Sequence, residues 1–307
     1  MKQIVVLTFV LLARFGFTQQ DPAFSQFMYN GLAIDPAMAG SSQTLSATAI
    51  SRQQWAGIKG APSTQTFNVD APWGKKVGLG LSVINDQLGI TKNLNISSQY
   101  AYRVQFGGST LSLGLQATVA SYRADYTSVI TNPNSLDQSI DNSFAQDIKR
   151  MGFNFGTGAY YYSQKFYAGI SIPHIFNQHF DGSRGSATKQ SRNYFFSAGY
   201  IVDVGPKVTI KPSALLKISE GQSVQLDLNS TVWYDNILGV GVSYRTNDSV
   251  TGLVQYQIGK QFRVGYARDF IVSSLSRYTT GNNEIMVRYE LRKKGEDTIA
   301  NRSRYFY

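Results

Sequence analysis

The stretch that decides the fold class is Ser223-Val224-Gln225-Leu226-Asp227-Leu228-Asn229-Ser230-Thr231-Val232-Trp233-Tyr234. Apolar residues recur at every second position, with Ser230 as the exception, and polar residues such as Asp227 and Asn229 stand between them. Successive side chains of a β-strand point to opposite sides, so this alternation indicates a strand with one apolar and one polar face. The same pattern returns in 261–267 and 284–292.

Working outward from this stretch, we expect about 14 strands, at 44–55, 62–72, 76–86, 91–106, 109–124, 150–163, 166–173, 191–204, 207–219, 222–235, 237–246, 249–258, 261–271 and 282–292. Every second connection is short and rich in Gly, Asn, Asp or Pro, whereas 125–149, 174–190 and 272–281 are long. Short turns at one end and long loops at the other are typical of bacterial outer-membrane barrels. The sequence therefore predicts an all-β fold, a transmembrane antiparallel β-barrel; a large secreted β-sandwich is the alternative.

Composition agrees with a membrane wall. Only 16% of residues are charged and there is no cysteine, against roughly 25% charged residues in ordinary soluble domains. The net charge of +10 is scattered through the strands and forms no basic stripe, which disfavours a nucleic-acid partner and favours a polyanionic lipid surface or an anion-lined passage. We expect the polar strand faces to line the lumen with Arg52, Arg103, Arg123, Lys211, Asp227, Arg245, Arg263, Arg288 and Glu290, and tyrosines such as Tyr122 and Tyr234 to form interfacial girdles.

The chain divides into four expected parts. Residues 1–18, with Lys2 before a short apolar run, suit a signal peptide. Residues 19–42 form an N-terminal periplasmic or plug segment, 43–292 the transmembrane barrel, and 293–307 a polar periplasmic tail. By the order of the strands, both flanking segments are expected on the periplasmic side.

Signals for catalysis are weak. The two histidines, His174 and His179, fall in one predicted loop, and a hydrolase would need a serine, a histidine and an orienting partner held together. Asp137, Asp141 and Asp147 match no calcium-loop spacing and are expected to be solvated loop charges. We predict that the protein is not an enzyme and has no metal site and no cofactor.

Three blocks carry a resemblance to a known family: 20–40, with Asp21-Pro22-Ala23-Phe24-Ser25-Gln26 and Asp35-Pro36-Ala37-Met38-Ala39-Gly40; 52–65, with Arg52-Gln53-Gln54-Trp55; and 78–89. They resemble the PorP/SprF family of type IX secretion and gliding-motility membrane proteins, although Asp35 stands where that family usually has Asn. The resemblance implies an outer-membrane location and a role in the export or anchoring of a large surface protein. The implied partners are the C-terminal sorting domain of an adhesin and periplasmic or outer-membrane secretion components.

Two segments are candidates for partner binding: Phe24, Ser25, Gln26, Phe27, Met28, Tyr29, Asn30 and Pro36 in the N-terminal segment, and Trp55, Gly57, Ile58, Gly60 and Pro62 in the first surface loop. The first segment could equally fill the lumen, and the second could be a tight hairpin held by Trp55. The competing functions are docking for secretion, a passive or substrate-specific channel for small solutes or lipids, and a structural barrel without transport.

Overall fold

The computed structural model describes residues 23–128, 147–179, 189–220 and 222–291. The predicted signal peptide 1–18, most of the predicted loop 125–149 and the predicted tail 293–307 lie outside the described residues. The strands are β1 Ser46–Gln53, β2 Ser63–Trp73, β3 Val77–Leu88, β4 Thr91–Phe106, β5 Ser109–Ala124, β6 Ile148–Tyr162, β7 Phe166–Ile172, β8 Gln178–His179, β9 Lys189–Gln190, β10 Asn193–Tyr200, β11 Val202–Asp203, β12 Val208–Ser219, β13 Gln225–Tyr234, β14 Leu238–Arg245, β15 Ser249–Ile258, β16 Phe262–Ile271 and β17 Asn282–Glu290.

The strands close into a barrel. Neighbours along the chain pair antiparallel from β1 to β7 and from β12 to β17, β1 pairs with β17, and β10 pairs with both β7 and β12. With β10 and β11 counted as one interrupted strand, the wall is a closed barrel of 14 strands, as the alternation predicts. Closure gives every strand two neighbours, which removes the unpaired edges that a bilayer cannot tolerate.

The two faces of the wall follow the alternation. In β13, Leu228, Val232 and Tyr234 are 47%, 44% and 56% exposed on the outside, whereas Asp227 and Asn229 are buried inside. Apolar side chains cover the outer face because they meet lipid, and the polar face is turned to the interior.

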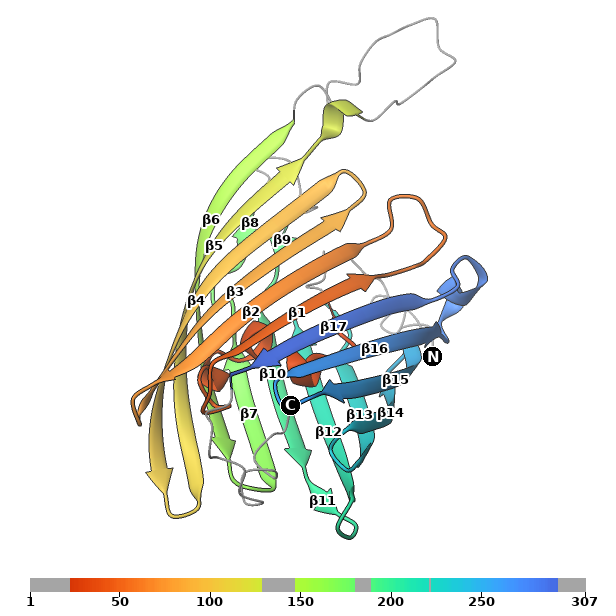
Figure 1. Cartoon of the computed structure of the whole chain (residues 1–307). Helices are drawn as coiled ribbons and strands as arrows, with labels where there is room; N and C mark the ends of the chain where they lie inside the picture. The colour runs from red at the N-terminus through yellow and green to blue at the C-terminus, as the bar shows by residue number, and fades with distance from the viewer. Residues whose placement is uncertain (1–22, 129–146, 180–188, 221, 292–307) are drawn as a thin grey trace, which may run out of the picture.

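Tight turns connect the strands at one end. The β13–β14 turn places Asp235 and Asn236 at φ 51° and 54°, the left-handed pair that a two-residue hairpin requires and that Asn and Asp tolerate. Figure 1 shows these short turns at the lower end and the longer connections at the upper end, where β5 and β6 rise highest. The upper end is the cell-surface end by the usual rule for such barrels.

Two features depart from the predicted strands. The expected strand 191–204 is divided at Ile201 into β10 and β11, although the Ile201 backbone N–H donates to the Lys165 carbonyl at 2.8 Å and so follows the β10–β7 register. The predicted loop 174–190 contains the small β8–β9 hairpin. Among the described residues, no helix has the length and apolar character needed to cross a membrane.

The predictions that Arg123 lines the lumen and that Tyr122 belongs to an interfacial girdle are wrong. Tyr122 is 1% exposed inside the barrel, where Ala120 and Ala124 pack in the same cluster, and Arg123 is exposed on the outer face. At this end of β5 the small apolar residues Ala120 and Ala124 face inward. The expectation that polar residues face the lumen therefore placed Arg123 on the wrong side of the wall.

Candidate functional site

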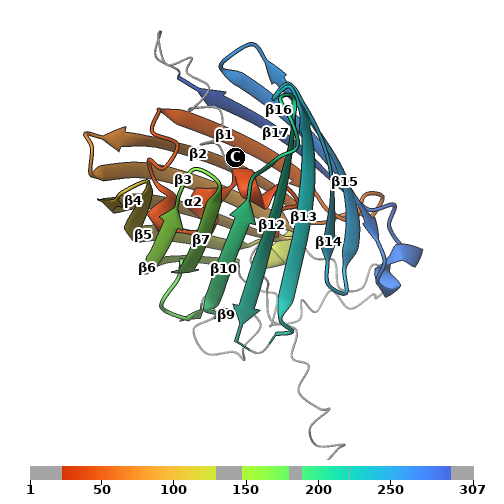
Figure 2. The same cartoon turned by 90° about the horizontal axis from the view of Figure 1, so that it is seen from below.

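The residues 23–42, which we call the plug segment, lie inside the barrel. They form short turns of helix: η1 Phe27–Tyr29, α2 Gly31–Ile34 and η2 Pro36–Met38. Figure 2, a view from the turn end, shows these coils enclosed by the ring of strands. Pro36 begins η2 with its φ already suited to a helix, and the Asp35 side chain caps that turn by accepting from the Ala37 N–H at 2.8 Å.

A charged cluster holds the start of the plug segment. The Glu284 carboxylate accepts from the backbone N–H groups of Ser25 and Gln26, each at 2.8 Å. Arg52 contacts Glu284 at 3.0 Å and Asp269 at 2.6 Å, and it also donates to the Ser25 hydroxyl at 2.7 Å. We call Arg52, Asp269 and Glu284 the latch; their side chains are at most 1% exposed. Buried charges persist only when they are paired and hydrogen-bonded, and here the plug segment completes the hydrogen bonding of the ion pairs.

A second ion pair contacts Phe24, the residue that precedes Ser25. Arg245 pairs with Asp227 at 2.9 Å and donates to the Phe24 carbonyl at 3.0 Å. Farther along, the Tyr29 hydroxyl donates to Gln255 at 2.7 Å, and the Arg263 guanidinium stacks 5.6 Å from the Tyr29 ring centre. The plug segment is therefore fixed by charge-assisted bonds from several strands rather than by apolar contact alone.

The end of the plug segment packs against bare backbone. The Gly40 N–H donates to Asp70 at 2.8 Å, and Arg103 donates to the Gly40 carbonyl at 2.7 Å. A Cβ added at Gly78 of β3 would overlap the Ala39 carbonyl, and one added at Gly114 of β5 would overlap the Ala37 backbone. Glycine at these inward positions allows the plug segment to approach the wall more closely than any other residue would.

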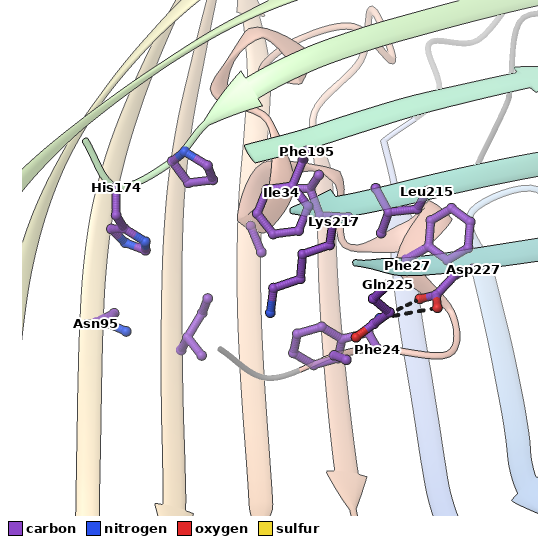
Figure 3. Close-up of a pocket in the computed structure, with 14 residues that line it drawn as sticks. Phe24, Phe27, Ile34, Asn95, His174, Phe195, Leu215, Lys217, Gln225 and Asp227 are labelled. Carbon is purple, nitrogen blue, oxygen red and sulfur yellow. Dashed lines mark hydrogen bonds between the residues drawn. The ribbon is translucent and has the colours of Figure 1, made fainter. Parts of the chain in front are cut away.

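A small cavity remains between the plug segment and the surface end. It holds about 60 Å³ and is lined by apolar residues including Phe24, Phe27 and Leu215, together with Lys217 and His174. Figure 3 shows the Lys217 side chain extending into the space between His174 and Phe24. A volume of this size has room for a few water molecules.

The first surface loop is tied to its neighbours. Trp55 has φ 48° and donates its backbone N–H to the Asn282 side chain at 2.9 Å, and Ala56 donates to the Gly281 carbonyl at 2.9 Å. Gly57 and Gly60 also have positive φ, at 99° and 78°. The loop is thus a rigid platform joined to the β16–β17 connection, with its tip exposed.

Comparison with known protein families shows which family this chain belongs to. The family model for the type IX secretion system membrane protein PorP/SprF matches residues 16–289. This chain belongs to the PorP/SprF family. Its location is the outer membrane, and its family and fold are those of a membrane secretion component or channel.

Other comparisons bear on architecture alone. No curated protein matches this PorP/SprF chain. The outer-membrane protein Omp33 of Acinetobacter baumannii is 9% identical with a TM-score of 0.46, covering 81% of this chain and 100% of that one. A Pseudomonas aeruginosa FadL homologue is 11% identical with a TM-score of 0.44, covering 81% and 89%. The CymD monoaromatic hydrocarbon channel is 12% identical with a TM-score of 0.46, covering 86% and 93%. These values are too low for any property of theirs to be transferred.

The structure separates the candidate residues of this PorP/SprF protein into two groups. Phe24–Asn30 and Pro36 are buried in the lumen against the strands and do not extend below the barrel on the periplasmic side. In the surface loop, Pro62 is buried, Trp55 is half-buried, and Gly57, Ile58 and Gly60 are exposed.

Sequence reasoning identified Arg52 as a lumen residue but missed its partners Asp269 and Glu284 and the role of Gly78 and Gly114. Asp269 and Glu284 occupy polar-face positions of their strands, and that signal could have included them.

Asp35 of the plug segment lies in an environment that disfavours its charged form. It is 1% exposed, and its Oδ2 has no hydrogen-bond partner among the described residues. Burial raises the pKa of the Asp35 carboxyl to about 7, and the hydrogen bond from Ala37 offsets only part of that rise. The family's usual Asn would fit the same space without a charge.

Replacing Asp35 by Asn is expected to remove a pH dependence of stability. The raised pKa means that, between about pH 4 and pH 7, the folded protein keeps a proton that the unfolded chain has lost. Wild-type stability therefore falls as pH rises through this window, by roughly 4 kcal/mol at most. The D35N variant should be flatter over this range and more stable than wild type at pH 8.

The measurement is the urea midpoint of the detergent-solubilised barrel from pH 4.5 to 8. Asp203→Asn, at a side chain 43% exposed, serves as the matched control. Parallel pH profiles for wild type and the D35N variant would contradict the prediction.

Proposed function

We propose that this PorP/SprF protein is a non-conducting docking component of the type IX secretion system. It helps to export and anchor a large surface protein through its surface loops, and it contacts periplasmic machinery through its turn end. The observation that carries the proposal is the latch: the plug segment donates hydrogen bonds to buried carboxylates of the ion cluster, so its release would leave those carboxylates without these bonds at a cost of several kcal/mol. A solute channel would need that segment to leave.

The surface loop supports docking because it combines rigidity with an exposed tip. The Gly89 N–H donates to the Gly60 carbonyl at 2.9 Å, so the loop is fixed to the β3–β4 turn as well as to the β16–β17 connection. Ile58 is 37% exposed at the tip beside exposed Lys59. A preorganised loop loses little conformational entropy when a partner binds.

The turn end supports contact with a partner of opposite charge. Exposed lysines stand in the described turns of this end, and they are Lys75, Lys76, Lys165, Lys207 and Lys260. Lys165 is engaged with Asp203 at 3.1 Å. A ring of positive charge attracts an acidic protein surface and speeds its encounter.

Crosslinked pull-down from native outer membranes, read by mass spectrometry, tests both contacts. The surface variant carries Ile58→Asp with Lys59→Asp, and we expect it to lose the secreted adhesin while keeping the periplasmic components. The turn variant carries Lys75→Glu with Lys76→Glu and should show the reverse pattern.

Leu275→Asp with Arg277→Asp is the matched control for the surface variant. Leu275 is also 37% exposed, two residues before Arg277, in η5 Ser274–Arg277 of a neighbouring loop. Recovery of the barrel without secretion partners from wild-type membranes would overturn the proposal. Loss of the adhesin in the control as well would overturn the assignment to the Trp55–Pro62 loop.

A further inference from the structure

Three basic side chains form a row on the outer face near the surface end. Lys92 of β4 is paired in register with Arg123 of β5, which is paired in turn with Lys149 of β6. All three residues are exposed. Adjacent strands lie about 4.8 Å apart, so the row extends over about 10 Å.

An apolar strip runs from this row toward the middle of the wall. The next outward residues on β6 are Met151, Phe153 and Phe155, which are 71%, 69% and 55% exposed. On β4, Leu94 and Ile96 face outward at matching heights, 37% and 43% exposed.

The strip also includes the outward residues of β5. Ser121 of β5 stands between Leu94 and Met151, and Ala117 of the same strand lies opposite Phe155. Val119, 37% exposed, lies between these two residues on β5, in register with Ile96 and Phe153, so the outward face of β5 continues the apolar strip between β4 and β6.

Acidic neighbours reduce the charge of the row without cancelling it. Arg123 forms an ion pair with Asp125, and Asp147 interacts with Arg123 and Lys149 while its carboxylate accepts from Thr127 at 3.1 Å. Three cations therefore face two carboxylates, which leaves the row with a net positive charge.

Strands β2 and β3, on the β4 side of the row, lack this arrangement. The outward residues at the surface end of β2 and β3 are uncharged, Gln65 on one and Asn85 and Gln87 on the other. Arg268 of β16 faces outward but donates to Asn283 at 2.6 Å. The row on β4–β6 is thus a local concentration of positive charge directly above apolar surface.

We propose that this row and strip bind the lipid A of outer-leaflet lipopolysaccharide. Its phosphates contact Lys92, Arg123 and Lys149, and its acyl chains lie along β5 between β4 and β6. The charge matches phosphate, whose oxygens accept strong bonds from ammonium and guanidinium groups. Lysine and arginine reach the headgroup level while their stems cover apolar surface.

The test measures binding of bisphosphorylated lipid A to the full detergent-solubilised barrel by native mass spectrometry. The variant combines K92Q, R123Q and K149Q, and we expect at least a tenfold loss of apparent affinity. Lipid A without phosphates should bind wild type and this variant equally weakly. Phe153→Ala alone should weaken binding of the phosphorylated form to a smaller extent.

The matched control replaces three lysines at the other end, K75Q, K165Q and K207Q, for the same change in net charge, and it should bind as wild type does. A change of gel mobility on heating verifies that each variant was folded before heating. No binding by wild type, an equal loss in the control, or equally tight binding of phosphatidylglycerol would each overturn the proposal.

Discussion

Replacing Arg52 by methionine is expected to destabilise the folded barrel by about 3–5 kcal/mol, the usual cost of removing one partner from a buried ion pair. Asp269 and Glu284 are 1% and 0% exposed, and both would be left without their guanidinium. The measurement is the shift of the urea midpoint in detergent, with an unchanged slope as the sign of an intact fold.

Two comparisons make the Arg52 result specific. Adding Asp269→Asn and Glu284→Gln to R52M removes the uncompensated charges and should restore part of the loss. Arg268→Met is the control, since Arg268 neighbours Asp269 but faces outward and is only half-buried; it should cost less than about 1 kcal/mol. A loss of under 1 kcal/mol for R52M, or no recovery in the triple variant, would contradict the role given to the latch.

Adding a methyl group at both Gly78 and Gly114 is expected to displace the plug segment and open the lumen to ions. In the G78A and G114A combination, the new atoms overlap the backbone of Ala39 and Ala37. Backbone cannot rotate away as a side chain can, so the strain of roughly 1–3 kcal/mol at each site falls on the seating of the segment. We expect steady ion currents in planar bilayers from this variant, where wild type shows none.

Gly252→Ala on β15 is the control for the glycine variant, because a Cβ at this position meets no atom within 4 Å. It should leave both stability and conductance unchanged. A G78A and G114A protein that stays as stable as wild type and carries no current would refute the close packing of the plug segment. Wild-type conductance equal to that of the variant would favour the solute-channel alternative.

Much of the wall could be predicted from local patterns. Alternation such as that of 223–234 depends only on the two-residue period of a strand, and lipid outside with polar residues inside fixes which set faces which way. Turn residues such as Asp235 and Asn236 indicate a hairpin from their own backbone preferences. Fold class, the number of strands and the family followed from such features, because each involves neighbours in the chain.

Local patterns could not place the plug segment. An aromatic run such as Phe24–Tyr29 suits a docking arm and a buried filling equally well. The choice depends on inward glycines supplied by separate strands, and on partners that stand far away in the chain: Arg52 and Glu284 are 232 residues apart. Only closure of the barrel brings these groups within bonding distance of Ser25.

The sequence by itself therefore determined that this protein is an outer-membrane barrel of the PorP/SprF family with short turns at one end and long loops at the other. The tertiary structure alone decided that its N-terminal segment fills the lumen and that Arg123 joins two lysines on the outer face. The physical reason is the same in both cases. Period and turn chemistry act between neighbouring residues, whereas ion pairing, close packing against glycine and the register of adjacent strands arise only when distant parts of the chain meet.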